Sequence, residues 1–320
     1  MQIPKIDISP VASGRIEDAQ AVAAKIDEAA KTVGFFVICG HGIAPKIFED
    51  LYDALGRFFS LPATEKNACR LDAGFTRDAD DYTPYGYSGL LEENAHAYMG
   101  RRDQPSDYVE KFSVGRLILD DEEELPFPTE GTAASFRQDV KLYFAACDNL
   151  ARQLTELFAI ALNLPRDYFA IRTNRSSDSL RLQTYPGYQR GFDNHQGMGE
   201  HTDGTLLTLL TDTSPGIEVK TRDGDWIRPV LDHIDDVLVN IGDLMMRWSN
   251  DEYVSTPHRV VLSDRSRQSV VYFKLANDEA IIEPFPMFLK AQSAKYPAIR
   301  YKDFSLGKMN ALFDRDEKSN

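Results

Sequence analysis

Residues 206–241 read LLTLLTDTSPGIEVKTRDGDWIRPVLDHIDDVLVNI, and this stretch decides the fold. It contains four short apolar runs, which are Leu206–Thr211, Ile217–Lys220, Trp226–Val230 and Val237–Ile241. Polar turn residues such as Asp223-Gly224-Asp225 separate them, and runs of this length between turns are typical of β-strands. Many short strands at near-regular spacing predict a closed barrel or a double-sheet jelly roll.

The same pattern continues on both sides of this stretch. Further strand-like runs are Leu180–Tyr185, Leu244–Trp248, His258–Leu262 and Ser269–Leu275. The first half of the chain has more helical periodicity. Its predicted elements are strands at Ile3–Ile8 and Gly34–Ile38 and helices at Ala19–Val33, Lys46–Phe59 and Thr132–Leu162. Residues 69–100 are rich in Asp, Gly and Tyr and are predicted to form a long loop.

We therefore predict a mainly β fold with flanking helices and a double-stranded β-helix (jelly-roll) core. The whole chain, 1–320, is expected to be a single catalytic unit. Within it, residues 1–175 are expected to form a helix-rich N-terminal region with core-edge strands. Residues 176–284 would form the jelly-roll core that carries a metal site, and residues 285–320 a C-terminal helical segment.

Composition excludes several classes of partner. The chain has 36 basic and 50 acidic residues, a net charge of −14, so phosphate backbones repel it and nucleic acid is not an expected partner. No run approaches the ~20 apolar residues of a membrane span, and the N-terminus lacks the pattern of a signal peptide. Three scattered cysteines are too few for a disulfide framework, which favours a reducing compartment, the cytoplasm. Oligomeric state has no signal in the sequence.

The strongest chemical signal is a possible metal site at His201-Thr202-Asp203. Residues two apart on a strand share one face, so both side chains can converge on one point. About one such triplet is expected by chance in a chain with 6 His and 50 acidic residues, so the triplet alone is weak. His258 begins another predicted strand. Two imidazoles and one carboxylate on one face of an octahedral iron(II) leave adjacent positions open for oxygen chemistry, although zinc could use the same ligands.

A second group of residues fits a bidentate 2-oxoacid at those open positions. Arg267 and Ser269 begin the next predicted strand after His258. A guanidinium binds a distal carboxylate through charge-assisted hydrogen bonds, each worth roughly 1.5–3 kcal/mol. Ser269 and the hydroxyl of Tyr185 could donate further hydrogen bonds. Together these three residues would seat a five-carbon diacid such as 2-oxoglutarate.

The chain resembles the isopenicillin N synthase-like Fe(II)/2-oxoglutarate-dependent dioxygenase family. The family's signature is similar to His201-x-Asp203, His258 and Arg267-x-Ser269. The likeness covers nearly the whole chain, and Gln183 stands where the family often has Asn. Other segments that resemble family motifs in the family's order are Gly34-Phe35-Phe36, His41-Gly42-Ile43, Phe58-Phe59-Ser60-Leu61-Pro62, Gly86-Tyr87, Glu110-Lys111-Phe112, Tyr185-Pro186, Gly242-Asp243 and Arg247-Trp248-Ser249-Asn250.

The resemblance implies a reaction class. It implies Fe(II) held by His201, Asp203 and His258, with 2-oxoglutarate and O2 as co-substrates. Oxidation of an unactivated C–H bond of a small organic molecule, by hydroxylation, desaturation or cyclisation, would accompany release of succinate and CO2. Some family members use the Arg-x-Ser pair for substrate, so an iron-dependent oxidase that does not use 2-oxoglutarate is one alternative. A non-catalytic jelly-roll binding protein is the other.

The substrate stays open between secondary metabolite, amino acid, peptide and nucleobase. Gly204, where the family often has a larger residue, is expected to widen the pocket near the metal. By analogy with the family, candidate pocket residues are Phe75, Arg77, Tyr82, Tyr85, Tyr87 and Phe304, with Arg77 or Arg190 as a partner for a carboxylate. His41 is predicted to be a structural turn residue, and His96, His195 and His233 are predicted to be surface groups.

Overall fold

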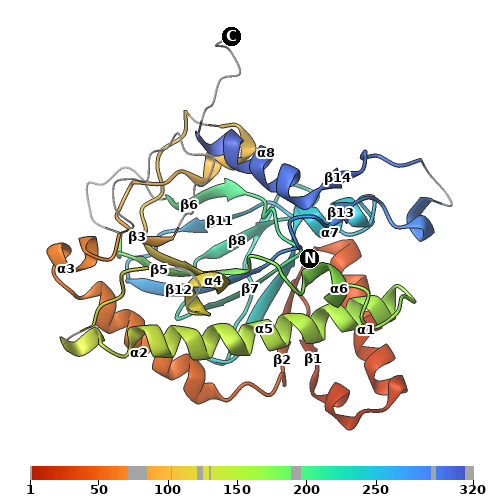
Figure 1. Ribbon diagram of the computed structural model, residues 1–320, viewed down its shortest axis with the longest axis horizontal. Coiled ribbons are helices and arrows are strands. Elements are labelled where there is room, and N and C mark those ends of the chain that lie inside the picture. The colour runs from red at the N-terminus through yellow and green to blue at the C-terminus, as the bar shows by residue number, and fades with distance from the viewer. Residues whose placement is uncertain are drawn as a thin grey trace.

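The computed structural model describes residues 2–70, 85–101, 103–120, 125–129, 131–188, 196–289 and 293–313. Its core consists of two facing β-sheets flanked by helices, as Figure 1 shows. The predicted jelly-roll core with flanking helices is confirmed. None of the helices in these ranges is long and apolar enough to cross a bilayer.

The larger sheet has eight strands in the described part of the chain. In spatial order they are β1 (Lys5–Asp7), β2 (Phe35–Cys39), β10 (Val237–Ile241), β7 (Leu207–Asp212), β12 (Arg267–Lys274), β5 (Ser179–Tyr185), β4 (Glu110–Gly115) and β3 (Gly86–Ser88). The smaller sheet runs β6 (Gln196–His201), β11 (His258–Val261), β8 (Ile217–Lys220) and β9 (Trp226–Ile227). A short pair, β13 (Ile281–Ile282) and β14 (Ile299–Arg300), lies apart from both.

Alternation along the strands gives the larger sheet two different faces. The face toward the smaller sheet packs Val271 and Leu210 against Ile217 and Val219 of β8. The opposite face belongs to the main hydrophobic core beneath the helices, where Tyr272 packs. On β12, therefore, Arg267, Ser269, Val271 and Phe273 point between the sheets.

Helices cover the outer face of the larger sheet. Figure 1 shows α5 lying across the strands, with α1 and α2 beside it. The helices are α1 (Ile16–Thr32), α2 (Pro45–Phe59), α3 (Ala63–Asn67), α4 (Arg116–Leu119), α5 (Phe136–Ala161), α6 (Ala170–Thr173), α7 (Asp243–Trp248) and α8 (Tyr301–Phe313). The 3-10 helices are η1 (Ser9–Ser13), η2 (Ala95–Met99), η3 (Gly131–Ala133) and η4 (Pro286–Leu289). Alanines and aliphatic residues at helical spacing on α1 and α5 form the buried stripes that dock them.

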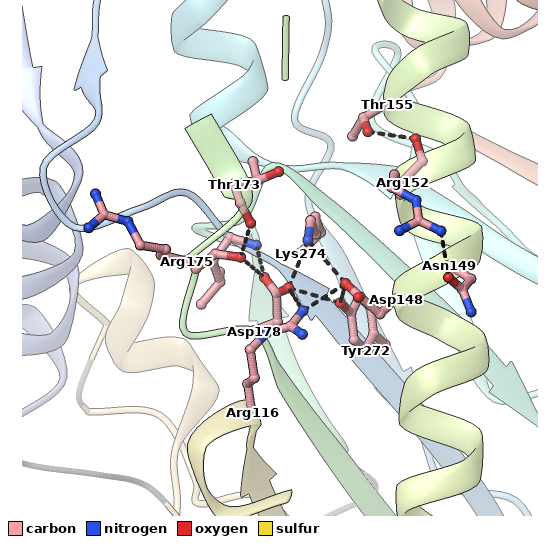
Figure 2. A network of polar contacts seen from close by, with 12 residues as sticks. Arg116, Asp148, Asn149, Arg152, Thr155, Thr173, Arg175, Asp178, Tyr272 and Lys274 are labelled. Atoms are coloured by element: carbon pink, nitrogen blue, oxygen red, sulfur yellow. Dashed lines mark hydrogen bonds and ion pairs between the residues drawn. The ribbon is translucent and has the colours of Figure 1, made fainter. Parts of the chain in front are cut away.

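A buried charge network ties α5 to the sheet (Figure 2). Arg116 donates to Asp148 and Asp178 at 2.7 Å each, and Lys274 donates to the same two carboxylates at 3.2 and 2.8 Å. The hydroxyl of Tyr272 donates to both at 3.0 Å. Two cations therefore balance two carboxylates, which removes the large cost of burying an unpaired charge.

Two sequence-based expectations about local structure are corrected. Leu244–Trp248, predicted as a strand, lies in helix α7. A short apolar run has no decisive periodicity, and here its apolar side chains are buried in the main core as a helix. The predicted long loop at 69–100 contains strand β3 and helix η2 in its described part.

Candidate active site

The predicted metal-binding residues meet at one point between the sheets. His201 ends β6, Asp203 follows two residues later, and His258 begins β11 directly opposite His201 in the strand pairing. One ligand atom from each residue lies within 4.8 Å of the others, and all three side chains are buried. The Nε2 atoms of His201 and His258 are 3.6 and 3.8 Å from the two carboxylate oxygens of Asp203.

Hydrogen bonds orient the three side chains for a cation. His201 Nδ1 lies 2.7 Å from the carbonyl of Gly199, and His258 Nδ1 lies 3.2 Å from the carbonyl of Thr256. A carbonyl only accepts, so each Nδ1 carries the proton and each Nε2 presents a lone pair to the centre of the cluster.

The carboxylate of Asp203 is oriented in the same way by its own neighbours. Its Oδ2 accepts hydrogen bonds from Thr208 Oγ1 at 2.8 Å and from Asn240 Nδ2 at 2.9 Å. These two donors stand on β7 and β10, opposite each other in the sheet. Both of these hydrogen bonds go to Oδ2. The other oxygen, Oδ1, lies 3.6 Å from His201 Nε2, and no hydrogen bond to it is found among the described residues.

The protonation states also suit metal binding. Burial and the neighbouring imidazole of His258 lower the pKa of His201 to about 3, so its ring is neutral at ordinary pH. Burial alone would raise the pKa of Asp203, but both imidazoles and the two hydrogen bonds outweigh it and lower this pKa to about 2. The cluster therefore offers two neutral nitrogens and one carboxylate oxygen, the form a divalent cation requires.

A second polar group lies on the inner face of the larger sheet. Arg267 is opposite Tyr185, and Ser269 is opposite Gln183, in the pairing of β12 with β5. The Cζ atom of Arg267 lies 4.9 Å from the centre of the Tyr185 ring, and Tyr185 donates its hydroxyl proton to Gln183 Oε1 at 3.2 Å. The four residues predicted to contact 2-oxoglutarate are therefore brought together, and all are buried.

Some N–H groups of Arg267 donate hydrogen bonds within the protein, and others do not. Its Nη2 donates to Asp212 Oδ2 at 2.8 Å, and its Nε donates to the carbonyl of Ser214 at 2.9 Å. Within the described ranges, Arg267 Nη1 and Ser269 Oγ are buried polar atoms with no hydrogen-bond partner. Buried donors without partners are rare because each costs about 1–3 kcal/mol. A ligand carboxylate would satisfy both.

Gly216 shapes the space beside this arginine. A Cβ at position 216 would lie 2.9 Å from Cδ and Nε of Arg267, so a larger residue there would displace the arginine side chain. The residues present therefore fit both groups that the resemblance implies. A His-Asp-His set suits Fe(II), and the unsatisfied donors suit a distal carboxylate.

This constellation inside a jelly roll defines the class of mononuclear non-haem iron oxygenases. The family model of the 2OG-Fe(II) oxygenase superfamily matches residues 176–275, and the model described as the N-terminal part of a non-haem dioxygenase in morphine synthesis matches residues 3–131. The chain belongs to this 2OG-Fe(II) oxygenase superfamily. It is an Fe(II)- and 2-oxoglutarate-dependent dioxygenase that oxidises a small molecule with O2 as co-substrate.

Relatives with different names are similar to most of this chain. The 2-oxoglutarate-Fe(II) type oxidoreductase ppzC of Metarhizium majus is 31% identical over 99% of this chain and 89% of its own. A homoarginine-6-hydroxylase of Arabidopsis thaliana is 30% identical over 92% and 82%. A full-length Neurospora crassa protein, solved in complex with alpha-KG and thymine, matches with a TM-score of 0.83, 27% identity, and 97% and 96% coverage.

Other residues predicted for the pocket have different positions. Tyr87 faces the outer core, where its ring packs 6.2 Å from Phe58, and Tyr85 and Phe304 also pack against that core. The space beside Gly204 is filled by the aliphatic chain of Lys308 from α8, whose Cδ would lie 3.0 Å from a Cβ there. Residues predicted from the sequence that lie outside the described residues are Phe75, Arg77, Tyr82, Arg190 and His195.

The histidine predictions had mixed outcomes. His41 lies between β2 and α2, where its Nδ1 accepts from the backbone N–H of Ile43 and its Nε2 lies 2.6 Å from the carbonyl oxygen of Asp235; this fits the predicted structural role, although no turn is assigned there. His233 is exposed, as predicted. His96 was wrongly predicted at the surface, because its ring is buried against Gly199 and its Nε2 lies 2.6 Å from Gln196 Oε1.

Sequence reasoning missed three residues that support the site, Thr208, Asn240 and Asp212. The sequence signal that could have indicated them is a polar residue in an otherwise apolar strand, such as Asn240 in the run VLVNI of β10.

Proposed function

We propose that His201, Asp203 and His258 hold Fe(II), and that Arg267 and Ser269 bind the distal carboxylate of 2-oxoglutarate. The observation that carries this proposal is the pair of buried unsatisfied donors, Arg267 Nη1 and Ser269 Oγ, on the sheet face that looks toward the His-Asp-His cluster. Tyr185 stacks on Arg267 and adds a hydroxyl to the same pocket, and Gln183 orients that hydroxyl.

Bound Fe(II) with 2-oxoglutarate and O2 supplies the oxidising power, and the oxoacid leaves as succinate and CO2. The protein's own residues do the positioning. Arg267 fixes the far end of the oxoacid, while Thr208 and Asn240 fix the carboxylate of Asp203. The surrounding buried strands exclude bulk water, which strengthens each of these contacts.

We propose hydroxylation of a C–H bond as the outcome, with desaturation and cyclisation as the variants that product analysis distinguishes. The names and ligands of the relatives do not agree on a substrate, since one is a homoarginine-6-hydroxylase and another was solved with thymine. The cytoplasmic location stays a prediction, and the three free cysteines are in keeping with it.

The test is an anaerobic titration of the metal-free protein with iron(II) and then 2-oxoglutarate, followed by visible absorption. We expect a weak charge-transfer band that needs both additions. His258→Ala should abolish iron binding, and Ser269→Ala should weaken the response to 2-oxoglutarate. Iron binding without the oxoacid band would favour an oxidase that does not use 2-oxoglutarate. Absence of iron binding would leave only the binding-protein alternative.

A further inference from the structure

The two strands that carry the proposed co-substrate residues carry another polar group further along the same face. On β5, Arg181 lies two residues from Gln183, and on β12, Phe273 lies six residues from Arg267, so all four side chains point between the sheets. The guanidinium carbon of Arg181 is 5.3 Å from the centre of the Phe273 ring. Both side chains are only half-buried, so a small molecule can reach them.

Glu93 and Lys111 lie beside Arg181. Lys111 on β4 is opposite Gln183, and its side chain is 2% exposed. Its Nζ donates to Glu93 Oε2 at 2.7 Å, while Ser88 Oγ donates to Glu93 Oε1 at 2.8 Å. Burial raises the pKa of Glu93, but the charges of Lys111 and Arg181 outweigh it, lower this pKa to about 2 and keep the group ionised. The Glu93 side chain is nevertheless 34% exposed.

The Arg181–Phe273 pair of this group lies near the His-Asp-His cluster and away from Arg267. Phe273 is opposite Thr208 in the sheet, and Thr208 donates the hydrogen bond that holds Asp203. The charge of Lys111 is close enough to lower the pKa of His201. Arg267 lies six residues from Phe273 on β12, which is about 20 Å along an extended strand. The Arg181–Phe273 pair therefore lies level with the His-Asp-His cluster, and Arg267 lies further along the same strand.

We propose that Glu93 and Arg181 bind the primary substrate, and that this substrate is a neutral cyclic amide or imide packed against Phe273. This inference rests on the function proposed above. Glu93 accepts a hydrogen bond from the substrate N–H, and Arg181 donates to the neighbouring carbonyl oxygen. Among the residues that the structure describes, one donor contacts each carboxylate oxygen of Glu93, which leaves each oxygen one further acceptor position.

Charge selects the neutral molecule over its charged competitors. An ammonium at Glu93 would be attracted by this carboxylate but repelled by the buried Nζ of Lys111, which already pairs with it at 2.7 Å, and it would also lose its hydration. A carboxylate at Arg181 would be attracted by the guanidinium but repelled by the ionised Glu93, and it would lose its hydration too. An uncharged molecule with N–H beside C=O can bond to both groups without either cost.

The experiment measures how tightly three small molecules bind to the protein under anaerobic conditions, after it has been loaded with iron(II) and 2-oxoglutarate. Thymine serves as the cyclic imide, homoarginine as a cationic amino acid, and nicotinate as an anion without N–H. Calorimetric titration should show binding of thymine and weaker or no binding of the other two. Glu93→Gln and Arg181→Met should each weaken thymine binding about tenfold or more, with the charge-transfer band and its 2-oxoglutarate dependence unchanged. Succinate release that depends on thymine should fall in parallel.

Glu110→Gln is the matched control. Glu110 is the neighbour of Lys111 on β4 and makes the same kind of contact, with Lys66 Nζ at 2.5 Å and the Tyr87 hydroxyl at 2.6 Å. Its side chain faces the outer core, so thymine binding should stay at the wild-type value. Thermal unfolding of all three variants shows whether a loss of binding reflects folding, and Arg181→Met leaves the Glu93–Lys111 pair intact.

Several outcomes overturn the inference. These are tighter binding of homoarginine or nicotinate than of thymine, no binding of any of the three, and wild-type thymine binding by folded Glu93→Gln and Arg181→Met. The charge-transfer band is recorded before any thymine is added. Its absence in the wild type would overturn the proposed function itself, whereas its presence with unaffected thymine binding would overturn only the assignment of Glu93 and Arg181.

Discussion

Replacement of Arg267 by methionine separates the two tasks that the structure gives this residue. One task is the contact with Asp212, whose side chain is only 4% exposed. The other is the donor at Nη1, which has no partner among the described residues. Methionine keeps much of the aliphatic volume and removes every hydrogen bond of the guanidinium.

The expected magnitudes follow from these contacts. Loss of one charged hydrogen bond to a ligand costs about 1.5–3 kcal/mol, which corresponds to about ten- to a hundredfold weaker binding of 2-oxoglutarate. Removal of one partner of a buried ion pair costs about 3–5 kcal/mol of stability, because Asp212 would be left buried and charged. Burial already raises the pKa of Asp212, so Arg267→Met should regain part of this stability as the pH falls and Asp212 takes up a proton.

A second variant makes the reasoning refutable. The double variant Arg267→Met/Asp212→Leu also removes the carboxylate of Asp212, which would otherwise stay buried without its cation. The free energy of unfolding should therefore return to near the wild-type value, while 2-oxoglutarate binding stays weak. Urea denaturation measures the first quantity, and anaerobic titration of the iron(II) protein with 2-oxoglutarate measures the second. Wild-type affinity in either variant would refute the assignment of Nη1 to the oxoacid. No recovery of stability in the double variant would refute the account of Asp212.

Three further predictions concern other parts of the structure. Asn240→Leu removes one of the two hydrogen bonds to Asp203 and should weaken iron(II) binding about 10- to 100-fold, measured by competition with a chelator. Asp178→Ala leaves Lys274 with one carboxylate partner instead of two and should lower the free energy of unfolding by about 3–5 kcal/mol in urea, without altering 2-oxoglutarate affinity (Figure 2). The folded-state pKa of Glu93, about 2, lies below the ordinary value of 4.5, so its contribution to stability is complete above about pH 4.5 and is lost as the pH falls toward 2. Denaturation across that range should show a steeper loss in the wild type than in Glu93→Gln.

Much of the fold was predictable because strand-forming runs and turns are local properties. The runs at Leu206–Thr211 and Val237–Ile241 became β7 and β10 within one residue. Leu244–Trp248 failed because a buried run of five residues does not distinguish a strand from a helix. The division of the chain at 175 and 284 stays a prediction.

The metal cluster was predictable for a chemical reason. Histidine is scarce in this chain, so a His-x-Asp triplet followed by a histidine at a strand start carries more information than any single residue. The residues that support the cluster were not predictable in the same way. Thr208 and Asn240 lie 5 and 37 positions from Asp203 in the sequence, and nothing local marks them as its partners.

The sequence by itself indicated where most of the core strands lie, and which residues to propose for iron(II) and for a dicarboxylate. Only the tertiary structure decided that Arg267 also pairs with Asp212, and that Glu93, Lys111 and Arg181 gather beside the metal cluster. The physical reason is strand register. Side chains alternate between faces, so a shift of one residue in a pairing would turn Arg181 or Lys111 from the space between the sheets to the outer core. Register is set by packing across the whole sheet, which no local pattern records.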